Sequence, residues 1–160
     1  MYYIFFLFLL KFKKIIMKYL STFILTLFIT TMSYSQDLNL TNAFKADFNI
    51  DSITLGVDSS NVNCSGAAIG YENGDYSAVY LTYHFTNKFE TDDKGEFTGL
   101  VWAQQCENFL RGTLQGVWRR KGQLFELITL DNINDGNTIL AVGELNFATR
   151  TLKFDASVVE

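Results

Sequence analysis

The sequence predicts an all-β protein in which about eight antiparallel strands form a meander that closes into a small barrel. A two-sheet β-sandwich is the second choice. Apolar and polar residues alternate through the chain after Gln36, and no segment there keeps a 3.6-residue apolar period for three turns. Short turns separate most of the strand-like segments, so each strand can pair with the next. No segment is long enough for the crossover that parallel strands need.

The first predicted strand covers residues 44–57. Apolar residues alternate from Phe44 to Ile50, the pattern changes phase at Asp51-Ser52, and alternation continues from Ile53. Because one extra residue in a strand shifts every later side chain to the other face, we expect a β-bulge there, or a break between two strands.

The next two strands are predicted at residues 66–71 and 76–85. They flank Glu72-Asn73-Gly74-Asp75, and Asn-Gly is a strong hairpin signal because both residues tolerate the positive φ angles of a type I′ turn. A two-residue loop at Asn73-Gly74 would place Cys64 opposite Tyr83.

Five further strands are predicted at residues 97–105, 109–119, 124–130, 138–146 and 152–158. A loop around Arg120-Lys121 would pair Trp118 with Gln123 on the inner face. The same register would place Gln115 opposite Glu126 on the outer face, which separates apolar from charged side chains on both strands.

Barrel closure is favoured over a sandwich because it removes the two exposed sheet edges. Gly112, Gly116 and Gly143 lie at interior positions, where glycine allows strands to coil tightly. Eight strands leave an interior that side chains just fill, or one that holds a single small ligand.

This architecture is lipocalin-like, or calycin-like. Gly116-Val117-Trp118 matches the G-x-W tripeptide of the lipocalins. In that family, however, the motif lies on the first strand, whereas here only about forty residues follow it. We therefore assign the chain to no family.

Residues 17–35 have the order of a cleavable signal peptide. Lys18 supplies the positive charge, residues 19–32 are largely apolar, and Ser33-Tyr34-Ser35 offers small residues at the cleavage positions. A 14-residue helix reaches about 21 Å, short of the roughly 30 Å hydrocarbon core, so we expect no membrane span after cleavage.

We expect Met17 to be the true start, with residues 1–16 an upstream extension and residues 36–160 a single domain. The protein is then exported, to the periplasm or outside the cell. Residues 36–160 contain nine basic and 17 acidic residues, a net charge of −8. This acidic balance, with no basic stripe, argues against nucleic acid and anionic membranes as partners.

Cys64 and Cys106 are the only two cysteines. An exported chain meets oxidising conditions, and both residues fall in phase with apolar neighbours, so we predict a buried Cys64–Cys106 disulfide. Two cysteines and one histidine are too few for a structural zinc site.

No catalytic motif is evident, and no cofactor or metal site is predicted. His84, the only histidine, shares the outer face of its strand with Tyr80 and Thr82. Glu126 is the other weak candidate for an acid or base. Asp131–Gly136 looks like a calcium loop, but Ile133 stands at a position that needs an oxygen ligand. Most strand carboxylates occupy polar positions, so we expect no buried acid with a raised pKa.

The predicted function is an exported binding module for a small apolar or sugar-like ligand. The supporting observations are the fold and a supply of aromatic side chains, of which Trp102, Trp118, Tyr80 and Tyr83 are the candidate ligand contacts. One alternative is a hydrolase or isomerase that uses His84 or a carboxylate at the barrel mouth. A further alternative is a filled, inert interaction protein of the cell envelope. The oligomeric state stays open.

Overall fold

A computed structural model describes residues 38–71, 74–88 and 91–160 of the chain. The expected extension 1–16 and signal peptide 17–35 lie outside these residues. The described part contains eight strands and no helix. A helix long and apolar enough to cross a membrane is accordingly not found among those residues.

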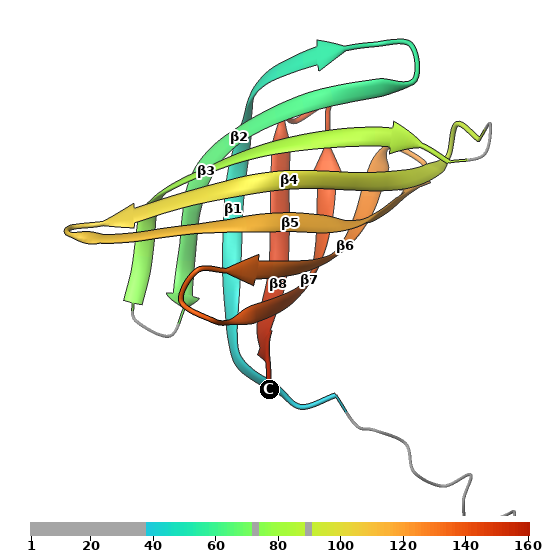
Figure 1. Cartoon of the computed structure of the whole chain (residues 1–160). Coiled ribbons are helices and arrows are strands. Elements are labelled where there is room, and N and C mark those ends of the chain that lie inside the picture. The colour runs from blue at the N-terminus through green and yellow to red at the C-terminus, as the bar shows by residue number, and fades with distance from the viewer. Residues whose placement is uncertain (1–37, 72–73, 89–90) are drawn as a thin grey trace, which may run out of the picture. The chain divides into compact units, whose positions relative to one another are not determined.

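The eight strands form a closed antiparallel barrel in which each strand pairs with its neighbours in the sequence and β8 pairs with β1 (Figure 1). The predicted barrel is therefore confirmed, and the sandwich is not formed. The strands are β1 (Leu40–Leu55), β2 (Ser59–Tyr71), β3 (Gly74–Asn87), β4 (Lys94–Gln105), β5 (Asn108–Lys121), β6 (Leu124–Ile133), β7 (Thr138–Asn146) and β8 (Thr151–Val159).

Side chains alternate between the interior and solvent as the sequence pattern predicts. In β8, Leu152 and Phe154 are buried while Lys153 between them is exposed. At the seam that closes the barrel, Lys45 of β1 lies opposite Asp155 of β8, and their side chains form an exposed ion pair of 3.0 Å. Burial of one face of every strand provides the main stabilisation of such a barrel.

The phase change in the first strand is a β-bulge, because the pairing of β1 with β2 shifts between Ile50 and Ser52. The Arg150 guanidinium stabilises it by donating hydrogen bonds to the carbonyl oxygens of Ile50 (2.9 Å) and Asp51 (3.0 Å). Beyond the bulge β1 pairs only with β2, and the two strands project past the barrel as a hairpin (Figure 1). We call the part of this hairpin in residues 52–60 the arm.

Two hairpins have a register that differs from the predicted one. Cys64 lies opposite Leu81 rather than Tyr83, and Trp118 lies opposite Leu127 rather than Gln123. Both differences are even numbers of residues, so the inward faces were predicted correctly although the partners were not.

The predicted Cys64–Cys106 disulfide is wrong, since both cysteines are free. Cys64 is buried inside the barrel as expected. Cys106 is exposed, because it occupies the two-residue turn between Gln105 and Asn108 with a φ angle of 52°. Leu100 and Trp102, the apolar neighbours in phase with Cys106, are themselves exposed, so the inner face assigned to this part of β4 was wrong, and the inward phase assigned to Cys106 was wrong with it.

Candidate functional site

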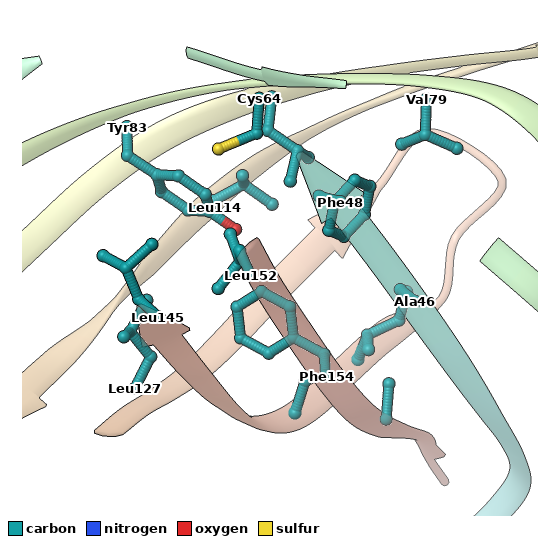
Figure 2. Close-up of a cluster of buried hydrophobic side chains, with 14 of the residues drawn as sticks. Ala46, Phe48, Cys64, Val79, Tyr83, Leu114, Leu127, Leu145, Leu152 and Phe154 are labelled. Carbon is teal, nitrogen blue, oxygen red and sulfur yellow. The ribbon is translucent and has the colours of Figure 1, made fainter. Parts of the chain in front are cut away.

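The two ends of the barrel are packed differently. The arm end carries the loops at residues 56–58, 122–123 and 147–150, and the opposite end carries the loops at residues 106–107 and 134–137. Towards the arm end the interior is filled with large side chains, namely Tyr83, Phe97, Trp118, Leu127, Leu145 and Leu152, all of which are buried (Figure 2 labels four of them).

Glycines allow this dense packing at the arm end. A Cβ atom on Gly95 would lie 2.5 Å from Nε1 of Trp118, and one on Gly116 would lie 2.6 Å from the ring of Phe97. Both distances are below van der Waals contact, so any side chain at these positions would displace a core aromatic residue. Nε1 of Trp118 donates a hydrogen bond of 3.0 Å to the carbonyl oxygen of Thr86, which fixes the indole in the core.

Towards the opposite end the interior is hollow. It holds a cavity of about 100 Å³ that reaches from the centre of the barrel to this end. Small side chains leave this space open: Ala46, Ala68, Ala103, Ala141 and Ala156 all line it. The rest of the lining is also mostly apolar and includes Phe48, Val79, Leu81, Leu114 and Phe154.

An aromatic cluster of Phe44, Tyr71 and Tyr76 lines the outer part of the cavity. The ring of Tyr71 packs edge-on against Phe44 (centroids 5.1 Å apart) and against Tyr76 (6.1 Å). Its hydroxyl donates a 2.7 Å hydrogen bond to Asp135 and accepts one of 2.9 Å from Asn137, both in the loop at residues 134–137. Tyr71 thereby ties β2 to the opposite wall and holds this end of the cavity together.

Thr129 and Asp131 on β6 are the buried polar side chains of the described interior, and both line the cavity. The Thr129 hydroxyl oxygen lies 3.0 Å from the carbonyl oxygen of Gln115 and also within hydrogen-bond distance of an Asp131 carboxyl oxygen. One hydroxyl carries one proton and can donate to only one of these two oxygens. A neutral Asp131 satisfies both contacts, because its own O–H donates to Thr129 and the Thr129 hydroxyl then donates to Gln115.

Burial raises the pKa of Asp131 from 3.8 to about 7. The contact with Thr129 and a backbone hydrogen bond from Gln115 act in the opposite direction, but desolvation is the larger effect. Removing a carboxylate from water into an apolar interior disfavours its charged form. Our expectation that the chain holds no buried acid with a raised pKa was therefore wrong.

Tyr83 stands at the boundary between the filled and the hollow parts. It is only 2% exposed, and it lines the cavity together with Asp131. Burial raises its pKa well above the usual value of 10, and the nearby Asp131 adds to this effect. Figure 2 shows its hydroxyl oxygen pointing into the barrel interior, towards Leu114.

A second hollow lies at the arm end, outside the packed layer. It is a groove of about 450 Å³ between the arm and the barrel, lined by Leu55, Val57, Phe85, Trp118, Phe125 and Phe147 among others. Leu55 and Val57 on the arm are 79% and 97% exposed. Tyr83 and Leu127 are part of the packed layer and do not line this groove, so it is separate from the inner cavity.

The candidate ligand contacts fall in three places. Tyr83 lines the inner cavity, Trp118 lines the groove at the arm end, and Tyr80 and Trp102 lie outside the barrel. Tyr80 and Trp102 are opposite each other on β3 and β4 and are 60% and 59% exposed. Of these four residues, only Tyr83 therefore lines the inner cavity.

The two candidate acid–base residues are also on the outer face. Nδ1 of His84 lies 2.9 Å from the side-chain oxygen of Asn61, in an exposed pair. Glu126 accepts hydrogen bonds from Lys121 (2.6 Å) and Arg119 (2.8 Å), and these contacts lower its pKa. Neither residue lines the cavity, and the lowered pKa makes Glu126 a poor general acid.

Sequence reasoning missed the role of Asp131 because it ended the strand at residue 130 and assigned the following residues to a turn. The strand continues to Ile133, and Leu127, Thr129 and Asp131 all face inwards. Extending the alternation of 124–130 by three residues would have placed the carboxyl group inside.

The described residues contain no group of three or more His, Cys, Asp or Glu side chains that could hold a metal ion. The fold and the cavity define the class of this protein as a small antiparallel barrel with a partly hollow, apolar interior. We compared the chain with family models, curated proteins and solved structures, and none of them matches it.

Proposed function

We propose that this protein is an exported binding module that holds one small apolar ligand inside its barrel. The observation that carries the proposal is the inner cavity, which is lined almost entirely by aliphatic and aromatic side chains. Side chains around an unfilled apolar cavity lack van der Waals contacts that a filled core would provide. Alanines in the lining therefore lower the stability of the fold relative to larger side chains. A ligand that fills the space would recover those contacts.

The size of the cavity sets the size of the ligand. Sites for drug-sized molecules usually measure roughly 300–1,000 Å³. An engineered apolar cavity of about 150 Å³ in another protein accepts benzene or xenon. The cavity of about 100 Å³ is thus suited to a molecule near the size of benzene, or to the end of an alkyl chain. Sugars are disfavoured, because the lining offers too few polar groups to replace their bonds to water.

An enzyme is the second candidate, and Asp131 is the observation that favours it. A carboxyl group with a pKa of about 7 in an apolar cavity has the properties of a general acid or base. Binding is the better supported function, because the described lining of the cavity contains no cysteine, lysine or histidine that could act as a nucleophile. If the protein is an enzyme, Asp131 replaces His84 and Glu126 as the acid–base candidate.

Benzene is a suitable probe for the cavity. We expect it to shift the backbone NMR signals of residues around the cavity, and to raise the melting temperature by preferential binding to the folded state. Ala141→Leu should weaken benzene binding, because Ala141 lines the cavity and is buried. Val142→Leu is the matched control, since Val142 is the next residue on β7 and is exposed. No binding to the unmodified protein, or equal binding by all three proteins, would contradict the proposal.

Export is tested separately, by mass spectrometry of the protein from the periplasm or the medium. We expect a new N-terminus at or near Gln36, after the Ser33-Tyr34-Ser35 sequence. A chain that keeps residues 17–35, or that stays in the cytoplasm, would contradict export and leave the cavity proposal standing.

A further inference from the structure

We propose that the ligand is a small apolar molecule that carries one uncharged hydroxyl group, and that this group binds between Tyr83 and Asp131. The inference rests on the proposed function and adds the chemical class of the ligand. Alcohols and phenols of about six carbon atoms belong to this class.

The first observation is the hydroxyl group of Tyr83. Within the described part of the chain this hydroxyl has no hydrogen-bond partner, although the side chain is only 2% exposed, and it faces the cavity inside the barrel (Figure 2). Buried hydroxyl groups almost always have a partner, because an unmet one loses its bonds to water without replacement. A side chain of phenylalanine would fill the same space without this penalty. The Tyr83 hydroxyl is therefore suited to donate a hydrogen bond to an oxygen of a ligand.

The second observation is independent and concerns Asp131, on the strand β6. Its carboxyl group lines the same cavity as Tyr83 and is held by Thr129, whose hydroxyl also contacts the carbonyl oxygen of Gln115. This support orients the carboxyl group at the cavity wall. A ligand hydroxyl could donate a hydrogen bond to a carboxyl oxygen of Asp131 and accept one from the Tyr83 hydroxyl. One ligand O–H group would then bind both residues.

The surroundings decide between an uncharged and a charged ligand. No described lysine or arginine lines the cavity, so a carboxylate or phosphate ligand would be buried without a counter-ion. An ammonium group would be transferred from water into a lining that is apolar apart from these few groups, and that transfer is unfavourable. A pure hydrocarbon would fit the space but would leave the Tyr83 hydroxyl unpaired.

The test compares ligands that differ only at the polar group. Benzene and phenol are titrated into the protein at pH 6, with NMR shifts or calorimetry as the readout. Cyclohexanol and cyclohexylamine, which is protonated at this pH, form a second pair. We expect phenol to bind at least about tenfold more tightly than benzene, and cyclohexanol more tightly than cyclohexylamine.

The variant Tyr83→Phe removes only the hydroxyl oxygen. We expect it to bind benzene at least as well as the unmodified protein and to lose the preference for phenol. Tyr80→Phe on the same strand is the matched control, because Tyr80 is outside the barrel and should leave both affinities unchanged. Binding of benzene by the variant also shows that it is folded.

The results of these titrations test the hydroxyl-binding inference and the proposed binding function separately. Equal binding of benzene and phenol, tighter binding of cyclohexylamine, or an unchanged phenol preference in Tyr83→Phe would overturn the inference and leave an apolar binding site. Failure of all four compounds to bind would overturn the inference together with the proposed function.

Discussion

At the scale of single residues, Asp131 links the stability of the fold to pH. An isolated aspartate has a pKa of about 3.8, whereas in the folded barrel burial raises the pKa of Asp131 to about 7. Between these two pH values the folded protein binds a proton that the unfolded chain has released. The contribution of Asp131 to the free energy of unfolding is therefore fully present below pH 4, decreases as the pH rises, and is lost above pH 7. The difference in pKa corresponds to about 4 kcal/mol.

Asp131→Asn should remove this pH dependence, because the amide has nearly the same shape and does not ionise. We expect the variant to be more stable than the unmodified protein at pH 8, with the difference shrinking or reversing at pH 4. Chemical denaturation at several pH values measures the free energy of unfolding of both proteins. Subtracting the pH curve of the variant from that of the unmodified protein cancels the contributions of the other carboxyl groups. A difference that does not change with pH would show that Asp131 has the same pKa in the folded and unfolded states.

At the scale of strands and turns, the sequence predicts faces more reliably than partners. Alternation placed Leu152 and Phe154 inside and Lys153 outside, as observed. It does not distinguish registers that differ by two or four residues, because these bury the same faces. The β5–β6 hairpin has its turn at Gly122-Gln123, so Glu126 lies opposite Arg119 rather than Gln115. That register gives Glu126 its ion pair with Arg119.

One strand boundary and one face assignment account for the errors at Asp131 and Cys106. Ending β6 at residue 130 left Asp131 out of the strand, and taking the face of Leu100 and Trp102 as the inner face of β4 placed Cys106 in the core, although that face is exposed. In contrast, the bulge near Asp51 could be predicted, because an extra residue in one strand moves the apolar alternation to the other phase. The cavity could not be predicted, since it depends on which alanines and glycines meet across the barrel.

At the scale of the whole barrel, the two ends differ in packing: one is filled by side chains and the other contains the cavity. The arm end is filled by large side chains around Leu127 and Leu145, which are among the most buried of the described residues. The other end keeps its shape with an empty space inside, because Tyr71 bonds across to the loop at residues 134–137. Closure of β8 on β1, where Lys45 lies opposite Asp155, completes the hydrogen-bonded wall around both ends.

The reactivity of the two free cysteines measures how often the closed barrel opens. Cys64 is 1% exposed, and burial together with the charge of Asp51 raises the pKa of its thiol to about 12, whereas Cys106 is exposed in a turn. Only the thiolate reacts quickly, so a thiol reagent should modify Cys106 at once and Cys64 only when the barrel opens. In the variant Cys106→Ser we expect a single slow reaction, which benzene slows further if it binds the closed barrel. Fast reaction of both thiols would mean that β2 opens locally. If neither cysteine reacts in the denatured, unreduced protein, the two are joined in a disulfide and the free thiols described above are wrong.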